Sequence, residues 1–148
     1  MNDFAAVFAL TQRSLAEQSR LYDEYGRGNR AAVLDALAEN VVWTSVAGPE
    51  IPWGGTHHGR AGVEEYFARL DAVLRITGYA VEQVIPEGEW VTILARARGR
   101  FLATGAELEL SKVDIMRIRD GRILEFREYY DTATVLAALR PPAPRGGS

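Results

Sequence analysis

The sequence predicts an α+β fold: a cone-shaped α+β barrel in which three N-terminal helices pack on a curved, mostly antiparallel sheet. Two observations lead to this prediction. Apolar residues recur at helical spacing early in the chain, whereas the second half consists of long alternating runs rich in β-branched residues. The pair Asp120-Gly121 separates two of these runs, which is a strong β-hairpin signal. Helices that precede an antiparallel meander favour helices on one face of a sheet, which would enclose a cavity.

The helices are expected where apolar spacing and helix-end residues coincide. The first helix covers residues 2–26 and ends at a Gly-Arg-Gly segment. Asn29 is a favourable cap for a short second helix over residues 29–38. The apolar stripe of residues 59–74 predicts a third helix, and residues 132–139 predict a short terminal one.

The strands are expected in segments that are rich in β-branched and aromatic residues and are bounded by turn residues. Residues 47–59 are rich in glycine and proline, so we expect a loop there. The expected strands are residues 41–46, 79–85, 90–102, 107–119 and 122–130.

The length of 148 residues suits one domain, which we place at residues 1–139. Residues 140–148 have the composition of a disordered tail. A hydrophobic content of 47% and a charged content of 25% are typical of a soluble globular protein. The net charge of −3 gives no indication of a nucleic-acid partner.

The chain contains no cysteine, which excludes disulfides, thiolate metal sites and cysteine nucleophiles. The first ten residues include an early acid and no basic region, so a secretory signal is not expected. No apolar run approaches membrane-spanning length. We therefore expect a cytoplasmic protein with no membrane partner.

The predicted hairpin carries charged residues on its apolar face. Side chains alternate along a strand, so Lys112 and Asp114 share a face with leucines and Met116, and Glu128 shares a face with Phe126. Buried charges are unfavourable unless they are paired, so three of them together indicate a pocket. Two other interpretations are a structural ion pair and a register one residue off, which would place all three in solvent.

Four segments carry a resemblance to a known family: residues 25–34, 39–43, 59–67 and 113–131. The order of elements and these segments resemble the ketosteroid-isomerase-like and SnoaL-like group, which has the nuclear transport factor 2-like (NTF2-like) fold. The resemblance implies a cone with an internal cavity. It also implies one of several functions, because this fold hosts isomerases, cyclases, epoxide hydrolases, dehydratases and binding modules.

The resemblance assigns positions residue by residue. Asp114 falls where steroid isomerases of the family place a protonated aspartic acid in the oxyanion hole. Ser45 falls at their general-base position. Their oxyanion tyrosine falls near Leu21, with Tyr22 and Tyr25 shifted in register.

Epoxide hydrolases of the fold place a catalytic acid at Glu128, within the segment of residues 126–129. Their Arg-x-Asp partner falls at Ala95 and Ala97, neither of which is charged.

Lys112, Asp114 and Glu128 are the candidate catalytic residues. Asp114 or Glu128 would move a proton, and Lys112 would stabilise an enolate or alkoxide or orient a carboxylate. The candidate substrate-binding residues are mostly aromatic, and each has a packing or solvated alternative: Tyr22, Trp43, Ser45, His58, Tyr66, Met116, Phe126 and Tyr130. The adjacent His57 and His58 cannot easily face one metal, so no metal site is expected.

We therefore expect a cofactor-free enzyme that uses acid–base chemistry on a small, largely apolar organic ligand. The alternatives are a non-catalytic module that binds a ligand in the same cavity and a dimerising accessory domain with a filled pocket. Arginines at 96, 98 and 100 alternate with small residues and would oppose Glu107 and Glu109 on the outer face. Such a face suits a homodimer.

Overall fold

A computed structural model describes residues 16–17 and 19–140 of the chain. Residues 19–26 are helical and are followed by α2 (Arg30–Asp35), which Asn29 caps by accepting a hydrogen bond from the Ala32 N–H. Most of the predicted first helix and tail, residues 1–15 and 141–148, lies outside the described residues. No helix in the described part is long and apolar enough to cross a bilayer.

Six strands form one sheet in the order β2-β1-β6-β5-β4-β3. The remaining elements are, in chain order, β1 (Leu37–Ser45), β2 (Gly55–His58), α3 (Gly59–Asp71), β3 (Leu74–Glu87), β4 (Trp90–Phe101), β5 (Glu107–Arg119), β6 (Arg122–Tyr130) and α4 (Thr132–Leu139). Strands β1 and β6 pair in parallel and all other neighbours are antiparallel, as the predicted meander requires. The sheet is open, with β2 and β3 at its edges.

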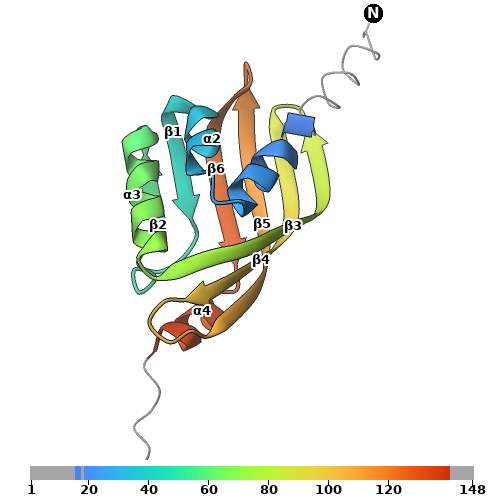
Figure 1. Cartoon of the computed structure of the whole chain (residues 1–148). Helices are drawn as coiled ribbons and strands as arrows, with labels where there is room; N and C mark the ends of the chain where they lie inside the picture. The colour runs from blue at the N-terminus through green and yellow to red at the C-terminus, as the bar shows by residue number, and fades with distance from the viewer. Residues whose placement is uncertain (1–15, 18, 141–148) are drawn as a thin grey trace, which may run out of the picture.

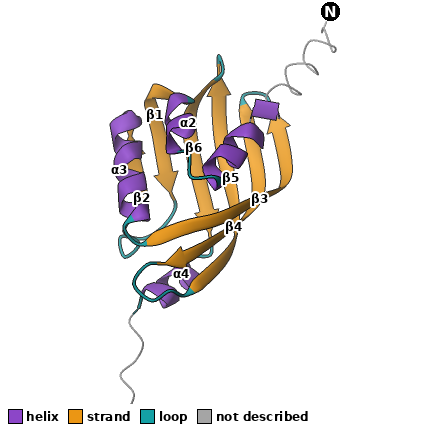
Figure 2. Ribbon diagram, in the orientation of Figure 1, coloured by secondary structure: helices purple, strands orange, loops and turns teal. Residues whose placement is uncertain are grey.

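The sheet curves around the helices and is covered by them on one face. Figure 1 shows α2, α3 and the blue helical segment on this face, with β3 bending across beneath them. The same view coloured by structure separates the layers, a helical layer in front of a strand layer, with α4 at one end (Figure 2). Register shifts at 76–78 and 81–83 in β3 mark bulges, which bend and twist a strand.

The core between the two layers is aromatic. Trp43 of β1 stacks on Phe126 of β6 with ring centroids 3.8 Å apart, and Tyr66 and Phe67 of α3 pack against Trp43 at 5.4 and 5.8 Å. The inner face of β4 carries Ala95, Ala97 and Gly99, as predicted, while the neighbouring arginines point outward. A Cβ on Gly99 would lie 2.8 Å from Leu74 Cδ1 and 3.1 Å from the Arg75 carbonyl oxygen, so this position requires glycine.

Several predicted boundaries are corrected. The second helix ends at Asp35 rather than Ala38, because Leu37 already pairs with Ile123 and the Ile123 N–H donates to the Ala36 carbonyl. Tertiary pairing thus overrides the helical propensity of Leu37 and Ala38. The third helix ends at Asp71 rather than Leu74. Leu74 is already the first residue of β3 and pairs with Phe101 at the end of β4. Part of the predicted 47–59 loop is the edge strand β2.

Strict alternation from Phe126 and Glu128 also predicts an inward Leu124, and this prediction is wrong. The pairing of β5 with β6 shifts between Arg117 and Ile118, so that Ile118 lies opposite Ile123. This bulge turns Ile123 inward, where it is 4% exposed, and leaves Leu124 half-buried. Beyond the bulge the predicted alternation holds, with Phe126 and Glu128 buried.

Candidate functional site

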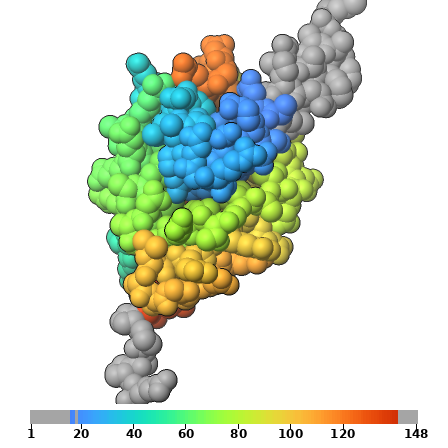
Figure 3. Space-filling model, viewed as in Figure 1, coloured from blue at the N-terminus to red at the C-terminus, as the bar shows by residue number. Residues whose placement is uncertain are grey.

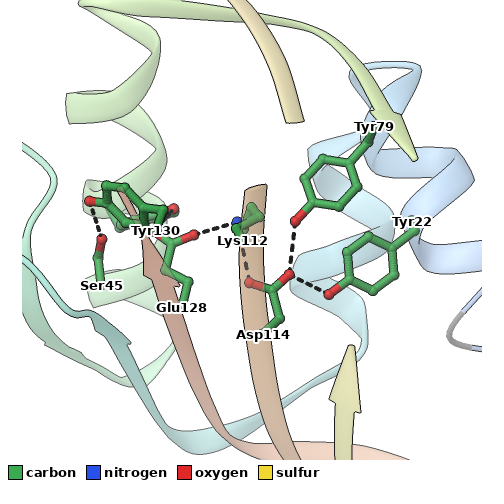
Figure 4. A network of polar contacts seen from close by, with 8 residues as sticks. Tyr22, Ser45, Tyr79, Lys112, Asp114, Glu128 and Tyr130 are labelled. Atoms are coloured by element: carbon green, nitrogen blue, oxygen red, sulfur yellow. Dashed lines mark hydrogen bonds and ion pairs between the residues drawn. The ribbon is translucent and has the colours of Figure 1, made fainter. Parts of the chain in front are cut away.

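Lys112, Asp114 and Glu128 converge on the inward face of the sheet. Lys112 and Asp114 are two positions apart on β5, and Asp114 lies directly opposite Glu128 on β6. Their side chains are 11%, 1% and 5% exposed, so all three are withdrawn from solvent. Figure 4 shows the three charged groups pointing toward one another, with tyrosines on both sides.

The Lys112 ammonium bridges the two carboxyl groups. Its Nζ donates to Glu128 Oε2 at 2.7 Å and lies 3.3 Å from Asp114 Oδ1. It also lies 5.3 Å from the centre of the Tyr79 ring, within cation–π range. Lys112 is the only lysine in the sequence, whereas every other basic position apart from the histidines is arginine. A compact ammonium with three donors fits between two carboxyls more easily than a planar guanidinium.

Two tyrosines from distant segments hold one oxygen of Asp114. Tyr22, in the helical segment 19–26, donates to Asp114 Oδ2 at 2.5 Å, and Tyr79 of β3 donates to the same oxygen at 2.8 Å. The other oxygen, Oδ1, is buried and forms an ion pair with Lys112, but it accepts no hydrogen bond from any described residue. The two oxygens of Asp114 therefore differ: Oδ2 is held by two hydroxyls, and Oδ1 contacts the Lys112 ammonium.

Glu128 is held from both sides. The Tyr66 hydroxyl of α3 donates to Glu128 Oε1 at 2.6 Å, while Lys112 binds Oε2. Both oxygens are thus engaged, which distinguishes Glu128 from Asp114. The indole N–H of Trp43 is buried nearby, and no described residue accepts a hydrogen bond from it.

Burial affects the two carboxyl groups differently. Burial raises the pKa of Asp114 above its ordinary value, although Lys112 and the two tyrosine hydroxyls oppose the increase. Burial would also raise the pKa of Glu128, but Lys112 and the hydrogen bonds from Lys112 and Tyr66 outweigh it and lower the pKa. The pKa values of the two carboxyl groups are thus shifted in opposite directions. This pattern is typical of a site in which one acid transfers a proton and its neighbour stays charged.

The Lys112 ammonium and the tyrosine hydroxyls around the two carboxyl groups keep their protons. Burial would lower the pKa of the Lys112 ammonium, but Asp114 and Glu128 raise it well above its ordinary value. Burial raises the pKa of Tyr22, Tyr66 and Tyr79 well above that of an exposed phenol. All four groups are therefore hydrogen-bond donors at neutral pH.

A small cavity, with about 50 Å³ of space for the centres of water-sized molecules, lies against this cluster. Its walls are predominantly apolar. Besides the three charged residues, the lining consists of Leu21, Tyr22, Tyr25, Val33, Trp43, Tyr66, Tyr79, Met116, Ile123 and Phe126. Concave apolar sites with a few converging polar groups are typical ligand sites.

Five of the eight predicted substrate-binding residues line this cavity: Tyr22, Trp43, Tyr66, Met116 and Phe126. Ser45 and Tyr130 do not line the cavity. Their hydroxyls form a hydrogen bond with each other at 2.8 Å. The predicted substrate-binding position of His58 is corrected, because its side chain is exposed and does not line the cavity. Alternation along β2 instead buries His57, whose Nε2 contacts the Trp53 carbonyl oxygen at 3.1 Å.

Sequence reasoning missed Tyr79, and it named Leu21 and Tyr25 only as neighbours of a family position. Tyr79 stands at the first position of the expected 79–85 strand and matches no motif. No local sequence signal marks it, because its position opposite Ala97 is set by the pairing of β3 with β4. Among the described residues, no group of three His, Cys, Asp or Glu side chains is arranged to hold a metal ion.

Comparison with known families gives the same architecture. A family model described as a SnoaL-like domain matches residues 19–126, which include the helical segment 19–26, β5 and the start of β6. The chain belongs to the SnoaL-like domain family. No curated protein matches this SnoaL-like chain significantly.

Solved structures share the fold at low sequence identity. An NTF2-like protein of unknown function from Burkholderia pseudomallei K96243 is 24% identical, with a TM-score of 0.77 over 86% of this chain and 97% of that one. An NTF2-like protein from Burkholderia thailandensis E264 is 26% identical, with a TM-score of 0.73 over 86% and 95%. A Catenulispora acidiphila protein with a ketosteroid isomerase-like fold, in complex with trimethylamine, is 20% identical, with a TM-score of 0.70 over 82% and 89%.

Proposed function

We propose that this SnoaL-like protein is a cofactor-free enzyme that moves a proton on a small, largely apolar organic molecule bound in the cavity. The reaction would be of the isomerase, cyclase, dehydratase or epoxide hydrolase type. One observation carries the proposal: Asp114 is a buried carboxyl of raised pKa, with one oxygen bound by two phenols and the other in an ion pair with Lys112. A general acid or base needs this combination of position and tuned pKa.

The roles follow from the geometry, taking isomerisation of an unsaturated ketone as the example. Asp114 Oδ1 accepts the proton as the α-carbon–hydrogen bond breaks, and the electron pair moves onto the carbonyl oxygen. Lys112 stabilises this enolate oxygen, because its three N–H donors allow a further bond beside the one to Glu128. Asp114 then returns the proton to the γ-carbon, which restores the carboxylate. The aromatic lining keeps water away from the enolate.

Isomerisation of cyclohex-3-en-1-one to cyclohex-2-en-1-one, followed by ultraviolet absorbance, tests the proposal. We expect wild-type protein to accelerate the reaction and Asp114→Asn to lose the acceleration by about 100-fold or more. Asp120→Asn is the matched control, because Asp120 is exposed in the hairpin turn and asparagine tolerates its φ of 51°. Equal rates for wild type and Asp114→Asn would overturn the assignment.

A non-catalytic binding module is the second candidate. It is supported by Ser45, which stands at the family's general-base position without a carboxylate, and by the closed Lys112–Glu128 pair. Selective ¹⁵N labelling of lysine gives one side-chain ammonium signal, since Lys112 is the only lysine. A signal that shifts with added cyclohex-2-en-1-one, together with no turnover in any variant, would support the module.

We extend the proposal to a homodimer in the cytoplasm. The outer face of the sheet carries interleaved charges, in which Arg96 binds Glu82 and Glu109 at 3.2 and 3.0 Å and Arg100 binds Glu107 at 3.3 Å. A face with both signs can pair with a second copy of itself. A cysteine-free chain also fits a reducing compartment. Light scattering coupled to size exclusion tests the dimer, and a monomeric mass at high concentration would contradict it.

A further inference from the structure

A second hollow lies on the other side of one wall of the cavity. It is formed by the helical segment that contains Glu17 and Leu21, by α2, and by the turn between β5 and β6. Figure 3 shows these three segments close together at one end of the molecule, where the orange hairpin tip stands above the light-blue α2 and the blue helical segment. Charged residues border this hollow, including Arg20, Asp35, Asp120 and Arg122.

The hollow and the cavity share two lining residues, Leu21 and Ile123. Both are aliphatic, and their exposed fractions are 9% and 4%. The outer hollow and the cavity therefore meet at two hydrocarbon side chains.

The two sides of this wall differ in rigidity. Ile123 is fixed by the bulge, by its pairing with Ile118 and Leu37, and by its N–H bond to the Ala36 carbonyl oxygen. Leu21 lies on the helical segment, and its neighbour Tyr22 is held at Asp114 by a hydrogen bond. The hydrogen bond of Tyr22 thus holds the backbone next to Leu21, while the leucine side chain itself carries no polar contact.

We propose that the outer hollow is the entrance to the cavity and that Leu21, closing against Ile123, is the residue that controls access. The proposal rests on the cavity being the ligand site described above. It also specifies the substrate class, because a molecule passing between two aliphatic side chains loses its hydration. An ion would be excluded there, whereas a neutral, largely apolar molecule would pass.

Quenching of Trp43 fluorescence tests the entrance without any turnover. Trp43 lines the cavity and not the hollow, so a double variant Trp53→Phe, Trp90→Phe leaves it as the single reporter. In this background we expect neutral acrylamide to quench Trp43 and iodide not to do so. Leu21→Ala and Ile123→Ala should each raise the acrylamide quenching constant several-fold, and Leu21→Phe should lower it.

Val33→Ala is the matched control, because Val33 lines the cavity but not the hollow. It removes similar volume from the core without opening the wall, and urea unfolding of each variant checks that quenching is measured on folded protein. An equal rise in Val33→Ala, no rise in Leu21→Ala, or quenching by iodide as strong as by acrylamide would overturn the entrance. Turnover of the cyclic ketone is measured separately, so a failure of the enzymatic proposal is distinguishable from a failure of the entrance.

Discussion

Asp114 and Glu128 lie directly opposite each other on neighbouring strands, and both are buried on the inward face. Two carboxylates in such a cross-strand pair repel each other, and burial increases the repulsion. The Lys112 ammonium, 2.7 Å from one and 3.3 Å from the other, makes the arrangement stable. The stability of the fold and the chemistry of the site therefore depend on the same three groups.

Replacement of Lys112 by methionine should destabilise the protein strongly at neutral pH. Removing one partner of a buried ion pair typically costs about 3–5 kcal/mol, because a charge is left buried without compensation. Both carboxyl pKa values would then lie above their unfolded values, so the lost stability should return as the pH falls and the carboxyls take up protons. Urea unfolding at several pH values measures this. Arg96→Met, which breaks only exposed ion pairs, should change stability little.

Asp114 should make wild-type protein less stable as the pH rises. Because burial raises its pKa above the ordinary 3.8, the folded protein keeps a proton that the unfolded chain has already lost. The contribution is fully present below the unfolded pKa and is lost as the pH rises through the folded pKa. Asp114→Asn should remove this decline. A free-energy difference between wild type and Asp114→Asn that is the same at about pH 4 and about pH 7 would contradict the raised pKa.

The two phenols on Asp114 should limit the increase of its pKa. Tyr79→Phe and Tyr22→Phe each remove one donor to Oδ2, so the Asp114 pKa should rise further, as ¹³C NMR titration of the carboxyl would show. Each change should also destabilise the protein by about 1.5–3 kcal/mol, the range for a hydrogen bond to a charged group. Tyr25 lines the same cavity without a bond to either carboxyl, so Tyr25→Phe should leave the Asp114 titration unchanged. The same upward shift in all three variants would point to a general loosening instead.

Gly99→Ala should destabilise the sheet where β4 passes β3. The added methyl group would lie 2.8 Å from Leu74 Cδ1 and 3.1 Å from a backbone oxygen, and overpacking of this kind costs about 1–3 kcal/mol. Gly78→Ala is the control, because its methyl group would meet nothing closer than 3.9 Å. Thermal or urea unfolding compares the two. The explanation by close packing fails if both variants lose the same stability.

The sequence was sufficient to place Lys112, Asp114 and Glu128 together. The turn at Asp120-Gly121 defines the hairpin, and a side-chain period of two then determines which residues face inward. The same reasoning failed at Ile123, because β6 also pairs with β1 there and the resulting bulge shifts the alternation. A bulge that depends on a third strand leaves no local signal in the sequence.

Tyr79 and β2 show the other limit of local patterns. Tyr79 reaches Asp114 only because bulges bend β3 over the cavity, and bending is a property of the strand pairing rather than of the residues near Tyr79. Strand β2 has the sequence Gly-Thr-His-His, which lacks a strand pattern and forms by pairing with β1. His58 therefore faces solvent and His57 faces the core, a choice that depends on the register of this edge strand.

The enclosed position of the only lysine has a practical consequence for handling the protein. Amine-reactive dyes, biotin esters and bifunctional cross-linkers need an accessible, deprotonated amine, and Lys112 is neither accessible nor readily deprotonated. Labelling with such reagents should therefore leave Lys112 and the cavity beside it unmodified.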